Sequence, residues 1–270
     1  MIGAGVTPAL EGTCRVLSGC GFPAPGTQSF EFSPMFSLAG YEVTKPVFLL
    51  VLSTAAIAAL VIVAFRRPAL VPRGLQNAME VYYDFIRIGI ARDVIGRDGE
   101  RFAPYLGTLF LFVFLLNFLE IVPGAQFPVT SKIAFPAVLS ALTWLIFNYL
   151  GVRRHGFFGY LKHVAVPSGL PKPLYLLITP IEFVSTIIIR PFTLAVRLFA
   201  NMFAGHLLLL IFTLGTTYLL VPRIQGIFAV VSFGMTFVLT GFELLIQFLQ
   251  AYIITLLTAT YIAGALDSEH

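Results

Sequence analysis

Residues 190–206 read RPFTLAVRLFANMFAGH and lie inside a run, Leu174 to Leu220, that is otherwise almost entirely apolar. The charged or strongly polar side chains of this stretch are Arg190, Arg197, Asn201 and His206. An ionisable side chain in a lipid-embedded helix costs roughly 3 kcal/mol on insertion scales, so such a residue is a functional-site hypothesis by default. The stretch therefore predicts a membrane-embedded helix that carries a functional site.

The composition indicates a membrane protein. Of its 270 residues, 58% are hydrophobic and 11% are charged, and the mean hydropathy is +0.91. A soluble domain carries about 25% charged residues. We therefore expect an all-α integral membrane protein rather than a globular domain with a large core. The net charge is +4, and the basic residues are dispersed among the loops. This distribution favours a membrane topology signal over nucleic-acid binding.

Apolar runs and their polar borders divide the chain into an N-terminal extramembrane arm, residues 1–45, and a membrane domain, residues 46–270. The arm contains Cys14 and Cys20, which either form a disulfide on an oxidising side or remain free thiols. Because a span needs about 20 apolar residues, we expect five membrane-embedded helices, at about residues 47–65, 102–122, 133–152, 174–220 and 225–266.

Two connections carry further expectations. Residues 74–92 place apolar side chains at helical spacing and charged side chains on the other side, a pattern that predicts one amphipathic helix on the membrane surface. Residues 153–173 contain several Pro, Lys and His side chains and are expected to form a polar loop.

The distribution of basic residues predicts the topology. With five crossings and the N-terminus outside, the inside would carry Arg66, Arg67, Arg73, Arg87, Arg92, Arg97, Arg101, Arg153, Arg154, Lys162 and Lys172. The outside would carry only Arg15, Lys45, Lys132 and Arg223. Since cytoplasmic loops are enriched in Lys and Arg, we expect the N-terminus outside and the C-terminus in the cytoplasm.

The last two apolar runs are too long for upright spans. A continuous helix over residues 174–220 would be about 70 Å long at about 1.5 Å per residue, whereas the hydrocarbon core is about 30 Å thick. Either each run breaks, or both helices lie strongly tilted in the membrane. Pro180 and Pro191 are candidates for a kink in the first run, because proline removes a backbone donor.

The polar residues of these runs fall on defined helix faces. Arg190, Arg197 and Asn201 lie within a narrow arc of one face, Glu182 lies on the same side, and His206 points to the opposite face. In the last run, Glu243, Gln247 and Gln250 follow i, i+4, i+7 spacing and form a single polar stripe.

An antiparallel pairing of the two runs brings these residues to common levels. The connection between the runs is short, and one register places Arg197 level with Gln250 and His206 level with Glu243. The second level lies about 13 Å from the first, towards the outside. Glu182 lies in the other direction, towards the inside.

The residue types indicate proton transfer. His and Glu can accept and release protons near neutral pH when their surroundings allow it, whereas Arg keeps its proton in a protein. Two proton access routes separated by an arginine barrier explain the arrangement economically. Arg197 has no obvious carboxylate partner at its own level, which suggests a partner on another chain.

Structural roles remain open for the other residues. His206 and Glu243 can form a hydrogen bond that only joins two helices, and Gln247 alone is more typical of packing. Glu120, near the end of the second span, is expected at the membrane interface. Arg190 can extend its side chain towards the inner surface.

The sequence resembles subunit a of F-type ATP synthases. The resemblance rests on RPFTLAVRLFANMFAGH (190–206), on GFELLIQFLQAYIITLLTATYIAGAL (241–266) and on LNFLEIVPG (116–124). It covers most of residues 70–270, and the Arg-Leu-Phe-x-Asn-Met core is highly specific. Where that family often has an Asp and an Asn before a Thr, between the second and third spans, this chain reads PVTSKIAFP and carries Lys132.

The resemblance implies roles for individual residues. Arg197 would be the essential stator arginine that faces the acidic residue of each passing c-ring subunit, with Asn201 and Gln250 beside it. His206 and Glu243 would line the half-channel open to the outside, and Glu182 would lie near the inner half-channel. Gln247 and Arg190 would be secondary, and the last two helices would form a strongly tilted hairpin against the ring.

The resemblance also implies partners and a location. The chain would be a non-catalytic subunit in the plasma membrane of a bacterium, without a cofactor or metal. It would assemble with the c-ring, with b-type peripheral stalk subunits and, through the complex, with the ATPase head.

Two other functions make different demands on the sequence. A secondary transporter with a midplane polar site would show inverted repeats and two interrupted helices in matching halves, and a haem-bearing subunit would show paired intramembrane histidines. Neither pattern is visible, and His206 is the one histidine expected at membrane depth.

Overall fold

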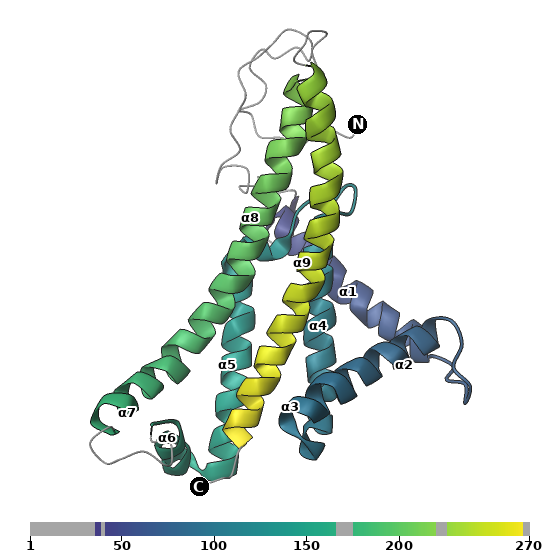
Figure 1. Cartoon of the computed structure of the whole chain (residues 1–270). Coiled ribbons are helices and arrows are strands. Elements are labelled where there is room, and N and C mark those ends of the chain that lie inside the picture. The colour runs from purple at the N-terminus through teal and green to yellow at the C-terminus, as the bar shows by residue number, and fades with distance from the viewer. Residues whose placement is uncertain (1–35, 39–40, 166–174, 220–225, 267–270) are drawn as a thin grey trace. The chain divides into compact units, whose positions relative to one another are not determined.

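A computed structural model of the chain describes residues 36–38, 41–165, 175–219 and 226–266 (Figure 1). Within these ranges the chain is almost wholly helical, which confirms the all-α prediction. The helices that are long and apolar enough to cross a membrane are Lys45–Phe65, Arg97–Phe118, Ala134–His155, Ile178–Thr217 and Gly226–Leu266. Cys14 and Cys20 lie outside the described residues.

A short hairpin precedes the first span. Strand β1, Phe36–Leu38, pairs antiparallel with strand β2, Tyr41–Val43, so that Phe36 lies opposite Val43. Helix α1, Lys45–Phe65, follows at once. The hairpin falls in the part of the sequence that we expected to form an extramembrane arm.

The expected amphipathic segment is helical. Helix α2, Leu75–Ile86, continues as a π-helix, η3, over Arg87–Arg92, and a short α3, Asp93–Ile95, ends it. Met79, Ile86 and Ile90 are buried along one side. On the other side, Arg87 Nη2 lies 2.6 Å from Glu100 Oε2 in the 3₁₀ turn η4, Arg97–Phe102, that leads into α4, Ala103–Phe118.

Part of the expected polar loop at residues 153–173 is a helix instead. Helix α5, Ala134–His155, stops at Gly156, whose φ of 73° lies in the left-handed region, and helix α6, Phe157–Ala165, begins directly after it. Tyr160 packs its ring on Gly151 and donates a 3.0 Å hydrogen bond to Asn148 Oδ1. These contacts with α5 bury Tyr160 and stabilise a helix that the polar composition of the segment did not predict. Residues 166–173 lie outside the described part.

The first of the two long runs changes its helical geometry at proline. Helix α7, Tyr175–Val184, passes into a π-helix, η7, Ser185–Ile189, before α8, Arg190–Leu219. The widened turn precedes Pro191, whose ring would clash with the carbonyl four residues earlier in a regular α-helix. The last run is one unbroken helix, α9, Gly226–Leu266, and its tilt in the membrane stays a prediction.

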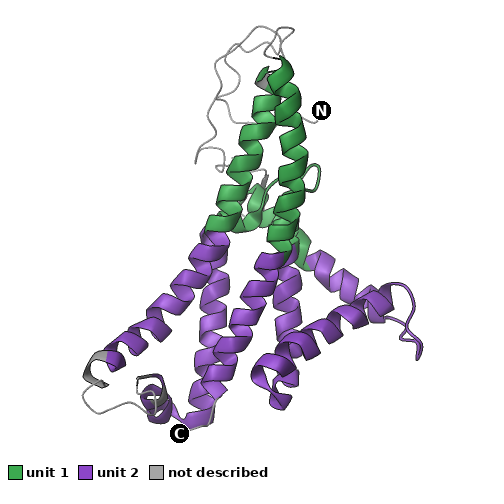
Figure 2. Ribbon diagram, viewed as in Figure 1, with its two compact units in different colours: residues 1–54, 115–132, 200–248 green, residues 55–114, 133–199, 249–270 purple. Residues whose placement is uncertain are grey.

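The chain divides into two compact units (Figure 2). Unit 1 contains residues 1–54, 115–132 and 200–248, and unit 2 contains residues 55–114, 133–199 and 249–270. Unit 2 has an apolar core to which α2, η3, α4 and parts of α8 and α9 contribute, with its largest fully buried members at Ile86, Ile90, Leu106, Leu198 and Ile254. Unit 1 buries several ionisable and amide side chains beside its apolar ones, among them Glu120, His206, Glu243 and Gln247.

Candidate functional site

A buried carboxylate, Glu120, is the centre of a polar cluster in unit 1. Helix α4 ends at Phe118, so Glu120 lies in the following turn, where its backbone N–H bonds Asn117 O at 3.0 Å. Only 5% of Glu120 is exposed. Burying a carboxylate is costly unless hydrogen bonds compensate it, so its partners decide what the site can do.

Two long helices supply those partners. Glu120 Oε1 shares a 3.1 Å hydrogen bond with His206 Nδ1 on α8. Glu120 Oε2 accepts a 3.1 Å hydrogen bond from Gln247 Nε2 on α9. One carboxylate therefore joins the turn after α4 to both α8 and α9, and all three side chains are buried.

Glu243 brings a second carboxyl group to the same cluster. Its side chain is 3% exposed and lies close enough to Glu120 for the two carboxyl groups to interact. It rests directly against Gly205 of α8, where a Cβ atom would overlap both carboxylate oxygens. An alanine at position 205 would therefore force the Glu243 carboxyl group to move.

The segment after α4 encloses the cluster. Thr130, in the 3₁₀ turn η5, Val129–Ser131, donates a hydrogen bond to Asn117 Oδ1. The Phe127 ring meets the His206 ring edge to face, with 5.9 Å between centroids. Thr130 and Phe127 are each 1% exposed, so the imidazole is held between a carboxylate and an aromatic ring.

Some buried polar atoms of the cluster have no hydrogen-bond partner within the described residues. They are Asn117 Nδ2, Glu243 Oε1 and Gln247 Oε1. Buried polar groups in proteins are paired with protein or with ordered water. The cluster therefore retains capacity for further hydrogen bonds next to its two carboxyl groups and its imidazole.

The contacts between α8 and α9 in unit 1 agree with the register expected from the short connection. Gly205 lies against Glu243, and a Cβ at Gly215 would lie 3.1 Å from Ser232 Oγ. Ser232 Oγ also donates a 2.8 Å hydrogen bond to Phe212 O. His206 and Glu243 thus belong to one level, as predicted, but the carboxylate that bonds the imidazole is Glu120.

The structure buries Glu120 against α8 and α9, whereas the expected interfacial position concerned membrane depth and stays a prediction. The second span was expected to continue to about residue 122, whereas α4 ends at Phe118 and Glu120 lies in the turn that follows. Two polar residues three apart, Asn117 and Glu120, in an otherwise apolar segment were the available signal. Thr130, the partner of Asn117, lies in the connection that carries Lys132.

Arg197 belongs to unit 2 and has a different environment. On α8, Leu194 and Leu198 are buried, whereas Arg197 is exposed. No described carboxylate forms an ion pair with it. Asn201, four residues later, is exposed as well. An apolar helix thus presents a guanidinium group on a face that the described part of the chain leaves exposed.

The remaining candidates in unit 2 are distributed over several helices. The Arg190 guanidinium lies over the Tyr261 ring, 5.3 Å from its centroid. We had expected the Arg190 side chain to extend towards the inner surface, and that expectation did not include this contact within the protein. Gln250 is 2% exposed on α9, and its level with Arg197 stays a prediction. Glu182 is partly exposed on α7.

Comparison with known proteins places this arrangement in a family. The family described as ATP synthase A chain matches residues 47–263. The chain belongs to the ATP synthase A chain family. Its relatives include ATP synthase subunit a of Streptomyces lividans, 47% identical over 97% of this chain and 94% of the relative, and that of Frankia alni, 47% identical over 94% and 90%. Subunit a of Parafrankia sp. is 54% identical over 76% of this chain and 70% of the relative.

Family membership and the five apolar helices together identify a bacterial membrane protein of the ATP synthase. The matched range includes every residue of the buried cluster around Glu120 as well as Arg197 and Gln250. Within the described residues, no group of three or more His, Cys, Asp or Glu side chains has an arrangement that could hold a metal ion.

Proposed function

We propose that the chain is the proton-translocating stator subunit of a rotary ATP synthase, with two aqueous half-channels separated by Arg197. The observation that carries the proposal is the buried cluster in which Glu120 bonds both His206 and Gln247. Three groups able to exchange protons, Glu120, His206 and Glu243, meet inside an apolar protein, and purely structural pairing would not require two carboxyl groups together.

The cluster is proposed to line the half-channel open to the outside. A proton arriving at Glu243 or Glu120 can pass to the imidazole of His206, because neighbouring acid and base groups within hydrogen-bond reach exchange protons. The unpaired oxygens of Glu243 and Gln247 are suited to bind the water molecules that would complete the route. Thr130 and Asn117 then act as positioning residues that hold the turn around Glu120.

Arg197 is proposed to face the c-ring. Its exposure on an apolar helix, without a described carboxylate partner, is costly in lipid and is compensated when a ring carboxylate lies opposite. Arginine stays protonated, so it attracts an ionised ring carboxylate and blocks direct proton passage between the half-channels. Asn201 and Gln250 are proposed to lie beside it, with Arg190 and Gln247 as secondary residues.

The proposed cycle follows from these positions. A proton enters past Glu243, Glu120 and His206 and neutralises a ring carboxylate, which then rotates through lipid. The carboxylate releases its proton towards the inner half-channel, near Glu182, as it meets Arg197. The chain itself makes and breaks no covalent bond other than those to protons, and ATP synthesis belongs to the partner head.

The proposal includes the assembly and the orientation. The partners are the c-ring, b-type peripheral stalk subunits and, through the complex, the ATPase head. The N-terminus lies outside and the C-terminus in the cytoplasm, as the distribution of basic residues indicates.

Replacing Arg197 with alanine tests the proposal. In inverted membrane vesicles, Arg197→Ala should abolish ATP-driven proton pumping, while the detached head hydrolyses ATP at the normal rate. Arg154→Ala, which removes an exposed arginine from the end of α5, is the matched control and should pump normally. Retained pumping in Arg197→Ala vesicles would exclude the assigned role.

A further inference from the structure

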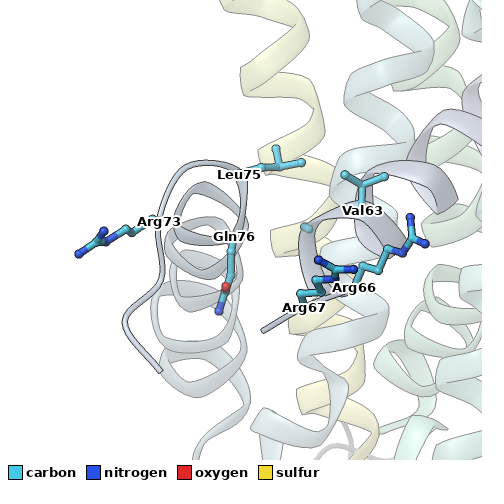
Figure 3. Close-up of a pocket in the computed structure, with 7 residues that line it drawn as sticks. Val63, Arg66, Arg67, Arg73, Leu75 and Gln76 are labelled. Carbon is cyan, nitrogen blue, oxygen red and sulfur yellow. The ribbon is translucent and has the colours of Figure 1, made fainter. Parts of the chain in front are cut away.

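The connection between α1 and α2 forms a hollow in unit 2 that proton transfer does not use. Its volume is about 520 Å³, and the residues that line it are Val63, Ala64, Arg66, Arg67, Arg73, Leu75 and Gln76 (Figure 3). Arg66 and Arg67 directly follow the last residue of α1, and Arg73 lies just before α2. Three arginine residues therefore line one hollow at the end of an apolar span, and Figure 3 shows their side chains projecting in different directions around it.

The hollow has a built framework, because Gln76 holds the connection in place. Its Oε1 accepts a 3.1 Å hydrogen bond from Ala69 N, and its Nε2 donates a 3.0 Å hydrogen bond to Ala69 O. The Gln76 residue is 9% exposed. Pro68 and Pro72 restrict the backbone on either side of Ala69, so the arginines project from a constrained loop.

The positive charge of the hollow is not neutralised by the described part of the chain. No described carboxylate forms an ion pair with Arg66, Arg67 or Arg73. The acidic residue that contacts the framework is Glu80, which accepts a 2.8 Å hydrogen bond from Gln76 Nε2 and does not line the hollow. The three arginines therefore leave the hollow positively charged and able to accept an anion from outside the chain.

The surroundings indicate which anion fits. Arginine forks match the oxygens of a phosphate group, and basic clusters beside a membrane span attract anionic lipid head groups. Large apolar side chains next to the arginines are exposed, including Val63, Phe65, Leu70, Val71 and Leu75. A ligand that combines a phosphate with an apolar tail satisfies both kinds of surface.

We propose that this hollow binds the phosphate group of an amphiphilic anion, with the head group of an anionic phospholipid as its source. Arg66 and Arg67 hold the phosphate oxygens, and Arg73 adds charge from the other side of the connection. The exposed apolar side chains contact the acyl chains. Free inorganic phosphate shares the head-group chemistry, and the experiment separates the two sources.

The test measures lipid binding to the purified full chain in a neutral detergent by native mass spectrometry. Phosphatidylglycerol is titrated, phosphatidylcholine serves as the zwitterionic comparison, and inorganic phosphate is added as a competitor. An arginine that contacts the lipid head group contributes about fivefold to binding of an anionic lipid. The double variant Arg66→Gln with Arg67→Gln should therefore bind phosphatidylglycerol about thirtyfold more weakly than the unmodified chain.

The chain offers a matched control for charge. Arg153→Gln with Arg154→Gln removes two adjacent exposed arginines from the end of another apolar span, and this variant should bind phosphatidylglycerol normally. Equal losses in the two double variants would show that net charge alone attracts the lipid, and would overturn the site. Binding of phosphatidylcholine as tight as that of phosphatidylglycerol would also overturn it.

A second variant tests the framework without removing charge. Gln76→Ala leaves all three arginines but deletes both hydrogen bonds to Ala69, and it should weaken phosphatidylglycerol binding several-fold with an unchanged helical circular-dichroism spectrum. Unchanged lipid binding in Gln76→Ala would refute the built hollow. Displacement of the lipid by millimolar inorganic phosphate would support the phosphate site and assign it to the free anion.

Discussion

Two substitutions at Glu120 separate the two roles of its side chain, which are hydrogen bonding to His206 and Gln247 and the proposed exchange of protons. Glu120→Ala removes the acceptor of Gln247 Nε2 and the partner of His206 Nδ1. Each buried polar group left without a partner costs about 1–3 kcal/mol. The two groups together predict a loss of about 2–6 kcal/mol, which is large relative to the stability of one compact unit. We therefore expect little assembled subunit in membranes from this variant.

Glu120→Gln keeps the shape of the side chain and both hydrogen bonds. Its amide oxygen can accept from Gln247, and its amide nitrogen can donate to the imidazole of His206. Exchanging a charge-assisted hydrogen bond for a neutral one costs about 1 kcal/mol, so the subunit should assemble at nearly the normal level. The amide cannot take up or release a proton near neutral pH, so pumping should fall strongly.

The assay pairs two readouts on the same vesicles. Immunoblots of membranes measure how much subunit is assembled, and quenching of an acridine dye after addition of ATP measures proton pumping. Glu120→Asp, which restores a carboxyl group one methylene shorter, should recover part of the pumping. If Glu120→Gln pumped protons at the normal rate per assembled complex, the proposed passage of protons through Glu120 would be wrong.

The same vesicles test two further contacts. Gly205→Ala places a Cβ where the Glu243 carboxylate lies, so overpacking should lower the stability of the fold by about 1–3 kcal/mol and reduce the amount of assembled subunit. The control Gly234→Ala, on an open face of α9, should assemble normally. Equal assembly of the two variants would contradict the close approach of Gly205 to Glu243. Exchanging the two groups, by His206→Glu together with Glu243→His, should retain more pumping than either single change, because only the double variant keeps one carboxyl group and one imidazole at these two positions. A double variant no better than the singles would refute their common level.

Much of the membrane architecture was predictable, because it depends on quantities summed over many residues. Long apolar runs at low charge density specify lipid-embedded helices wherever they occur in a chain. The exposure of Arg197 and the burial of Glu243 and Gln247 agree with helical periodicity applied to residue numbers. The face of a helix on which a residue lies can be predicted from the constant angle between successive residues.

The partner of His206 could not be obtained in this way. Glu120 reaches the imidazole from the turn that follows the end of α4 at Phe118. The point at which an apolar helix ends depends on contacts distant in sequence. The helix over Phe157–Ala165 was missed for the same reason, since Tyr160 gains its burial from Gly151 and Asn148 on α5.

Composition and periodicity thus suffice to establish a helical membrane protein with an arginine on an exposed helix face, because hydrophobic length and helical angle are local properties. The folded chain alone decides that Glu120, rather than Glu243, hydrogen-bonds His206, and that Gln76 clamps the loop that carries three arginines. Both outcomes depend on where a turn directs a side chain, and a turn is selected by the hydrogen bonds and packing that become possible only when distant segments meet.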